Sequence, residues 1–167
     1  MNFRKSNQSD VVGIISIISK AQIYFRNNNI DQWQNGYPNE KTIINDINND
    51  RSYVLIDNEE VVATTVVMFE EEKTYNEIYE GKWLTNSKYA TIHRIAVDDK
   101  LKGNNIASRI LKEAEKICIK NNIYSIKIDT HEDNKSMQRL LQKNNYKYCG
   151  IIYLIDGNKR IAFEKVL

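Results

Sequence analysis

RIAVDDKLKGNNIASRILKEAEK, residues 94–116, is the stretch that decides the fold. It begins with the end of an apolar strand at Val97, passes through a polar turn, and enters an amphipathic helix near Asn105 or Ile106. The first N–H groups of a helix lack partners, and its N-terminus carries about half a positive charge. The stretch therefore predicts either an anion-binding turn or a plain strand-to-helix turn with solvated lysines.

The residues of this turn suit a phosphate without forming a known phosphate loop. Gly103 leaves space where a ligand would approach, and Asn104 or Asn105 could adopt the positive φ that glycine usually supplies. Ala107 keeps the first helical turn narrow, and Lys102 adds positive charge. The turn lacks both the Gly-Lys-Ser/Thr of a P-loop and the three glycines of a dinucleotide-binding fingerprint.

The rest of the chain alternates between strand and helix patterns. The connection from strand 89–97 through the helix to strand 124–130 is a crossover and predicts a parallel pair, whereas the hairpins predict antiparallel pairs. The expected fold class is α/β (α+β), with a mixed, mostly antiparallel sheet of about seven strands and about four helices. Strands are predicted at 2–5, 52–57, 61–69, 89–97, 124–130, 148–155 and 159–167, and helices at 10–26, 40–48, 105–121 and 134–144.

Length and composition indicate how many domains the chain has and which classes of protein it does not belong to. We expect one domain over residues 1–167. The 24 basic and 22 acidic residues give a net charge of +2, which argues against a dedicated nucleic-acid-binding protein. No segment has the length and apolarity of a membrane span. Asp10 stands between the N-terminal basic residues and the apolar run 11–18, so we expect a helix capped by Ser9 or Asp10 there rather than a signal peptide. Cys118 and Cys149 lack metal-ligand spacing, which predicts reduced core cysteines, no metal and a cytoplasmic protein.

Two runs resemble the recurring motifs of the GNAT (Gcn5-related N-acetyltransferase) superfamily. Residues 102–107, Lys-Gly-Asn-Asn-Ile-Ala, resemble its acetyl-CoA-binding segment Gln/Arg-x-x-Gly-x-Gly/Ala, with Asn105 in place of the central glycine. Residues 134–146 resemble its Asn-x-x-Ala-x-x-x-Tyr-x-x-x-Gly-Phe run, with Asn134 matching, Tyr146 in place of Phe, and Leu141 at the tyrosine position. The fragments QWQNGYPN, GKW and IHRIAV are similar to those of a bacterial group within this superfamily.

The resemblance implies acetyl-CoA as co-substrate. Strands 89–97 and 124–130 would splay apart, and the pantetheine arm would pair with the backbone of Ile95 and Val97, with Asn134 nearby. The diphosphate would bind at the backbone of the turn, formed by Lys102, Gly103, Asn104, Asn105, Ile106, Ala107 and Ser108, and Ser108 would add its hydroxyl.

The resemblance also implies transfer of the acetyl group to an amine, which must first lose a proton. The Val97 N–H would stabilise the thioester oxygen. Thr91 stands where some relatives have a glutamate base, and His93, on the same strand face, is either the base or a hydrogen-bonded strand histidine. Arg94 faces the other way, which favours a structural ion pair.

The sequence leaves the identity of the proton donor to the leaving thiolate undecided, because the leucine at 141 has no exchangeable proton. Tyr153 or Tyr148 could replace the missing tyrosine, the thiolate could leave unaided, or both tyrosines could be strand-packing residues.

Aromatic residues in two variable connections are the candidates for acceptor binding. They could hold an alkylammonium group by cation–π contact, or they could simply anchor long loops. The acidic residues around them suit a cationic acceptor or are solvated. The aromatic candidates are Trp33, Tyr37, Tyr75 and Trp83, with Tyr79, and the acidic residues are Glu70, Glu71, Glu72, Glu77 and Glu80.

The sequence thus predicts an acetyl-CoA-dependent N-acetyltransferase that acts on a primary amine of a small molecule or peptide by direct attack in a ternary complex. An acyl-CoA-binding or sensor protein with little or no turnover is the alternative that Leu141 and Asn105 motivate, and another nucleotide-binding α/β domain is a third. We expect no nucleic-acid or membrane partner, and the C-terminal hairpin could pair across a homodimer.

Overall fold

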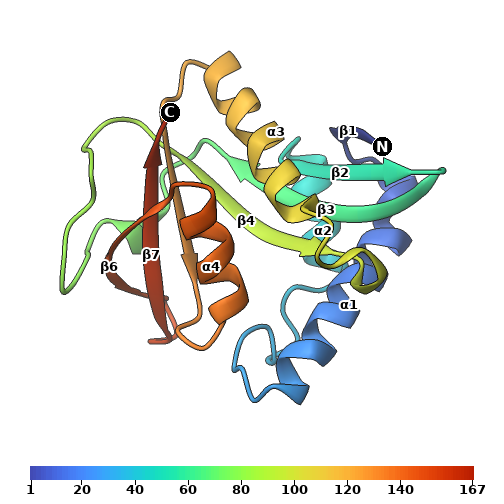
Figure 1. The fold of residues 1–167 in the computed structure, drawn as a ribbon, viewed down its shortest axis with the longest axis horizontal. Helices are drawn as coiled ribbons and strands as arrows, with labels where there is room; N and C mark the ends of the chain where they lie inside the picture. Colours follow the sequence, from blue (N-terminus) through green and yellow to red (C-terminus); the bar gives the residue numbers. More distant parts are fainter. The chain divides into compact units, whose positions relative to one another are not determined.

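Seven strands and four α-helices follow one another in the computed structural model, which describes residues 1–167 (Figure 1). Their order confirms the predicted succession of elements, and most boundaries lie within one or two residues of the prediction. The strands are β1 (Asn2–Lys5), β2 (Ser52–Asp57), β3 (Glu60–Met68), β4 (Ala90–Val97), β5 (Ser125–Thr130), β6 (Lys147–Tyr153) and β7 (Lys159–Val166). The helices are α1 (Val11–Asn27), α2 (Glu40–Asn48), α3 (Ile106–Lys120) and α4 (Lys135–Lys143).

The strands form one mixed sheet in the order β1-β2-β3-β4-β5-β7-β6. The β1–β2, β2–β3, β5–β7 and β6–β7 pairs are antiparallel, and β4 and β5 are parallel, with Ala90 opposite Ile126 and Thr91 opposite Lys127. The predicted fold class and the parallel pair are therefore confirmed. The splaying of this pair beyond Thr91 stays a prediction.

The chain divides into two compact units, whose boundaries fall within β3, β4 and α3 rather than in a linker. The N-terminal unit comprises Met1–Val67 and His93–Glu113, and the C-terminal unit comprises Met68–Ile92 and Ala114–Leu167. The expectation of a single domain over residues 1–167 stays a prediction.

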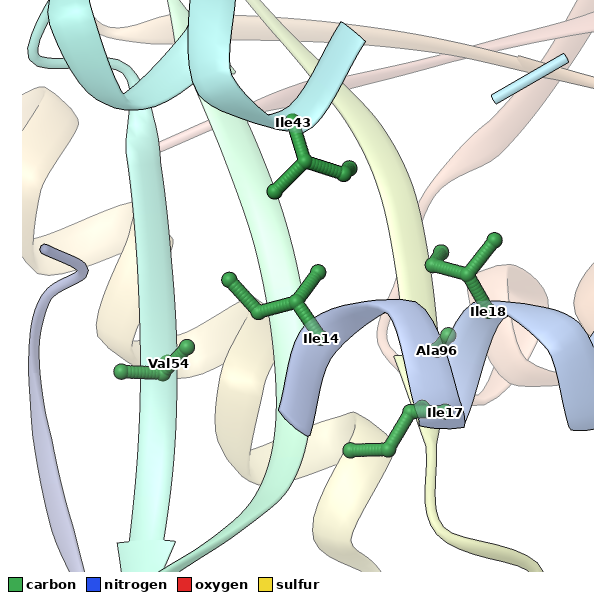
Figure 2. Close-up of a cluster of buried hydrophobic side chains, with 6 residues drawn as sticks. All are labelled: Ile14, Ile17, Ile18, Ile43, Val54 and Ala96. Atoms are coloured by element: carbon green, nitrogen blue, oxygen red, sulfur yellow. The ribbon is translucent and has the colours of Figure 1, made fainter. Parts of the chain in front are cut away.

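The N-terminal unit has an apolar layer on each face of its strands. On one face, isoleucines at helical spacing in α1 pack with Ile43 of α2, Val54 of β2 and Ala96 of β4 (Figure 2). On the other face, Ile106 and Ile110 of α3 pack on residues of β2 and β3. Val97 at the end of β4 also packs against the α3 layer, so the start of α3 and the end of β4 share one hydrophobic cluster, which holds the turn between them.

The C-terminal unit buries the connection between β3 and β4 against β6 and β7. Tyr75, with 2% of its surface exposed, packs with Ile152 and Ala162, and Trp83 and Tyr89 join this cluster. The buried Glu164 of β7 accepts hydrogen bonds from the Leu84 N–H and from the hydroxyls of Thr85 and Ser125. This long connection is therefore anchored by the fold and not a loose loop.

Local features of the N-terminus differ from the prediction. A short 3₁₀ turn, Gln8–Asp10, precedes α1, and Asn7 caps it instead of Ser9. Asp10 lies at the start of α1, but its carboxylate accepts hydrogen bonds from the Arg4 guanidinium and the Asn7 N–H. This ion pair holds the pKa of the Asp10 carboxyl below its ordinary value. No helix is long and apolar enough to cross a membrane.

Candidate acetyl-CoA-binding and catalytic site

The turn between β4 and α3 has the backbone that an anion-binding turn requires. A 3₁₀ turn at Asp99–Leu101 is followed by Gly103 at φ 87° and Asn105 at φ 59°. The first helical hydrogen bond runs from the Arg109 N–H to the Asn105 carbonyl at 3.0 Å. Asparagine tolerates positive φ better than other non-glycine residues, so the expectation that Asn104 or Asn105 replaces a glycine is confirmed for Asn105.

The candidate donors of this turn are backbone N–H groups at the start of α3, before the hydrogen bonds that run within the helix. The N–H groups of Ile106, Ala107 and Ser108 lie in the first turn of the helix, where the macrodipole favours negative charge. A methyl group built on Gly103 would meet no atom within 4 Å, so the approach to the backbone is open there. These residues fit a diphosphate, with backbone N–H groups as donors and Lys102 as the nearby cation.

The residues of β4 leading to the turn have different environments. Ile95 and Val97 are partly buried, and Val97 packs against the cluster under α3. Burial and the neighbouring Arg94 charge lower the pKa of His93 to about 3. The imidazole is therefore neutral at physiological pH but is a weak proton acceptor. Thr91 is fully buried, and its hydroxyl has no hydrogen-bond partner.

Arg94 forms the structural ion pair that the sequence predicted. Its φ of 53° breaks the regular alternation of β4, and its Nη2 lies 2.8 Å from the Asp46 carboxylate of α2. Its other terminal nitrogen donates to the hydroxyl of Tyr37, whose ring it also faces. The strand that holds Ile95 and Val97 is thereby tied to α2 and to the connection between α1 and α2.

The second motif lies in the C-terminal unit. Asn134 is buried and caps α4, because its side-chain oxygen accepts the Met137 N–H at 3.1 Å. Leu141 is completely buried, so the position of the expected tyrosine holds a core residue. Tyr146 is also buried, and its hydroxyl is 3.4 Å from Glu115. Burial raises the pKa of the Tyr146 phenol, which agrees with a packing role.

The alternative proton donors Tyr148 and Tyr153 are both about half exposed. The Tyr148 ring packs edge-on against Phe163, and the Tyr153 ring packs edge-on against Tyr79 at 5.4 Å. Tyr153 ends β6, which runs parallel to β5 because both pair antiparallel with β7. Tyr153 is the better candidate of the two, because it lies at the carboxyl end of β6 whereas Tyr148 lies near its start.

Comparison with known proteins assigns the family. The model of the acetyltransferase (GNAT) family matches residues 16–146. A crystal structure of a GNAT-family acetyltransferase from Streptococcus agalactiae is 33% identical, with a TM-score of 0.90 over 99% of this chain and 95% of that one. The chain belongs to the GNAT acetyltransferase family. It is accordingly an N-acetyltransferase by family and by fold.

More distant GNAT structures share the fold. The PaiA N-acetyltransferase of Thermoplasma acidophilum, solved with coenzyme A, is 16% identical, with a TM-score of 0.73 over 99% of this chain and 98% of that one. The ribosomal-protein-alanine N-acetyltransferase of Brucella melitensis is 12% identical, with a TM-score of 0.70 over the whole of both chains. Comparison with curated proteins gave no match.

The aromatic candidates of this GNAT chain come from both units. In the N-terminal unit, the Trp33 ring packs edge-on against the Phe25 ring, with 5.5 Å between the ring centres. The Tyr37 hydroxyl accepts a hydrogen bond from Arg94. In the C-terminal unit, the Trp83 and Tyr75 rings lie 5.2 Å apart, and the Trp83 indole donates to the Tyr75 carbonyl.

A cation–π site does exist beside Trp83, but the chain's own lysine fills it. The Lys127 ammonium lies 4.3 Å from the Trp83 ring centre and 4.0 Å from the Tyr89 ring centre. Lys127 is 5% exposed, and burial lowers its pKa. The ring faces of Trp83 and Tyr89 therefore stabilise an internal cation, which the sequence pattern does not indicate.

Sequence reasoning also missed Asp129, which lies near the carboxyl end of β5. The Tyr75 hydroxyl donates to its carboxylate at 2.6 Å, and the Arg160 Nε lies 3.8 Å away. Burial is the main cause that raises the pKa of this carboxyl. Asp129 could have been found from the period-two polar face Ser125-x-Lys127-x-Asp129, because this face of β5 also carries the partner of Thr91. No group of three or more His, Cys, Asp or Glu side chains is placed to hold a metal ion.

The backbone of Asn105 makes a testable prediction about cofactor binding. Asn105→Gly should bind acetyl-CoA at least as tightly as the wild type, because glycine adopts φ 59° without strain. Asn105→Val should bind about tenfold more weakly, because a β-branched residue at positive φ is strained by about 1–2 kcal/mol. Calorimetric titration with acetyl-CoA measures both values.

Asn122→Val is the matched control, since Asn122 follows α3 at φ 58° and lies outside the turn. It should lower the unfolding temperature without weakening acetyl-CoA binding. Wild-type affinity in Asn105→Val would contradict the role given to this backbone.

Proposed function

We propose that this GNAT protein transfers the acetyl group of acetyl-CoA to a primary amine of a small molecule or peptide by direct attack in a ternary complex. The observation that carries the proposal is the turn after β4, where Gly103 and Asn105 both adopt positive φ in front of the N-terminus of α3. Family membership supports the same co-substrate.

Acetyl-CoA supplies an activated acyl group as a thioester. The turn 102–108 would hold the diphosphate, with Ile95, Val97 and Asn134 along the pantetheine arm, as the family resemblance suggests. The Val97 N–H would donate to the thioester oxygen as negative charge develops on it.

Asp129 is our proposed proton acceptor for the amine, in preference to His93. Ligands of α/β sheets bind beyond the carboxyl ends of parallel strands, and Asp129 lies near that end of β5 on the face of Thr91 and Lys127. Its raised pKa brings the carboxylate closer to the range of a useful base, whereas the lowered pKa of His93 makes the imidazole a weak one. The hydrogen bond from Tyr75 orients the carboxylate.

The departing thiolate would take a proton from Tyr153 or leave without one. The family's tyrosine position cannot supply it, because Leu141 is buried and has no exchangeable proton. A thiol pKa of about 8.5 makes the thiolate a tolerable leaving group, so loss of a proton donor slows turnover without abolishing it.

The acceptor class follows from two features of the C-terminal unit. Asp129 supplies a carboxylate for an amine, while Lys127 already fills the cage of Trp83 and Tyr89. The proposal therefore relies on the carboxylate rather than on these rings to recognise the amine. We keep the predicted cytoplasmic location, which the free buried thiols of Cys118 and Cys149 suit.

Two measurements test this function in sequence. Calorimetry should show binding of acetyl-CoA and of dephospho-CoA, which keeps the pantetheine arm and the diphosphate, and much weaker binding of ATP, which has no pantetheine arm. Thiol release should then rise when polyamines, amino acids, aminoglycosides or peptides are added one at a time. No binding of acetyl-CoA at millimolar concentration would overturn the proposal, and binding without stimulation by any amine would favour an acyl-CoA-binding or sensor protein.

A further inference from the structure

The turn after β4 contains negative charge at a place proposed to receive an anion. Asp98 and Asp99 directly precede Lys100, Leu101 and Lys102, which lead into the donors of α3. The Asp98 carboxylate accepts the Lys100 N–H at 3.0 Å and so shapes the 3₁₀ turn. These carboxylates are therefore part of the turn's structure, yet without compensation they would repel a diphosphate.

One lysine of α1 forms an ion pair with both carboxylates and offsets one of their two charges. The Lys20 ammonium lies 2.8 Å from Asp98 Oδ2 and 3.1 Å from Asp99 Oδ1. Lys20 accordingly lowers the pKa of the Asp98 carboxyl, and the two aspartates raise the pKa of Lys20. This ion pair joins residues 78 positions apart, and Figure 1 shows α1 beside the turn.

The next turn of α1 contacts the other end of the same segment. Tyr24 is four residues after Lys20, so both side chains lie on one face of the helix. The Lys102 ammonium sits 4.0 Å from the centre of the Tyr24 ring. The ring thereby holds the cation that would face the diphosphate.

We propose that Lys20 and Tyr24 are positioning residues of the coenzyme A turn, Lys20 by fixing both Asp98 and Asp99 and offsetting one of their two negative charges, and Tyr24 by holding Lys102. The proposal rests on the proposed function. Through these two residues, α1 would contribute to the affinity for the diphosphate part of the co-substrate. The hydrophobic face of α1 makes no such contribution.

Lys20→Met should weaken acetyl-CoA binding about fivefold at low ionic strength, because the turn then faces the dianion with one more unit of net negative charge. The effect should shrink at 0.5 M salt, where charges separated by more than a few ångströms are screened. The unfolding temperature should change little, since an ion pair whose lysine is more than a third exposed adds little stability. Calorimetry at two salt concentrations and a thermal melt measure these effects.

Three comparisons separate a positioning role from a merely structural one. Lys41→Met removes an equal charge from an exposed site on α2 and should bind acetyl-CoA normally. Acetyl-pantetheine, which lacks the diphosphate, should be used equally by the wild type and Lys20→Met. Adding Asp99→Asn to Lys20→Met should restore part of the affinity for acetyl-CoA.

Tyr24 has a matched pair of its own. Tyr24→Phe keeps the ring and should bind normally, whereas Tyr24→Leu should bind more weakly. Equal affinity of the wild type, Lys20→Met and Tyr24→Leu for acetyl-CoA would overturn the inference, and so would equal losses with acetyl-pantetheine. If the wild type itself does not bind acetyl-CoA, the proposed function fails first, and the two failures are distinguishable.

Discussion

Asp129→Asn should lower kcat for acetyl transfer by about 10²–10⁴-fold, which is the usual contribution of a general base. The amide is isosteric with the carboxylate and can still accept the Tyr75 hydrogen bond, so the fold and the acetyl-CoA affinity should remain within about twofold. Steady-state kinetics with the best amine acceptor, together with calorimetry, measures the two quantities separately.

The pH profile distinguishes a base from a packing residue. In the wild type, kcat should fall as the pH drops through the raised pKa of Asp129, because a protonated carboxyl cannot accept the proton of the amine. This acidic limb should vanish in Asp129→Asn. The Tyr75 hydrogen bond lowers the pKa of Asp129, so Tyr75→Phe should move the limb to higher pH.

Glu132→Gln is the matched control, because Glu132 is a more exposed carboxylate three residues further on that pairs with Lys159. It should keep normal kcat and a normal pH profile. His93→Gln tests the competing base. If kcat falls strongly in His93→Gln and stays near the wild-type value in Asp129→Asn, the histidine is the base.

The turn and Asp129 show what could be predicted from the sequence and what could not. The strand-turn-helix pattern and the tolerance of asparagine for positive φ are local properties, so the conformation of Asn105 could be anticipated from residues 94–116. The pKa of His93 depends on burial by distant residues, which a strand pattern does not contain. Residue type and strand face therefore left His93 as either a base or a hydrogen-bonded strand histidine.

The aromatic residues illustrate the same limit of a local pattern. Tyr75 and Trp83 were predicted to bind an external cation because of their type and their place in a variable connection. The structure fills the cage with Lys127, which is 44 positions after Trp83 and reaches it only through sheet pairing. Periodicity placed Lys127 on a strand but could not identify its partners.

Arg94→Met should destabilise the fold by about 3 kcal/mol, since it leaves the Asp46 carboxylate buried without its partner. Denaturant unfolding at pH 7 measures this loss. The double variant Arg94→Met with Asp46→Asn should recover much of it, because no buried charge then remains. Arg26→Met, which removes an exposed arginine of α1, is the control for loss of a positive charge and should cost far less.

The sign of the pH dependence follows from Asp46. Burial raises its pKa above the unfolded value in the wild type, although Arg94 opposes this shift. Removing Arg94 should raise the pKa further, so the folded state keeps its proton to higher pH than the unfolded chain does. Stability of Arg94→Met should therefore be greatest near the unfolded pKa of about 4 and fall as the pH rises through the folded pKa. A deficit that is equal at pH 5 and pH 8 would show that the Asp46 charge is not its cause.

The same variant connects this ion pair to the proposed cofactor strand. Arg94 occupies a positive-φ position between His93 and Ile95, and its contact with Asp46 offsets the strain of that backbone. Without the contact, the relaxed strand would present the Ile95 and Val97 backbone differently, and acetyl-CoA binding should weaken even where the protein remains folded. Arg94→Lys keeps a charge but loses the planar donor pair, so it should fall between wild type and Arg94→Met in both stability and affinity. Parallel losses of both quantities across this series would tie the buried pair to the geometry of the site, whereas lost stability with unchanged affinity would confine its role to the fold.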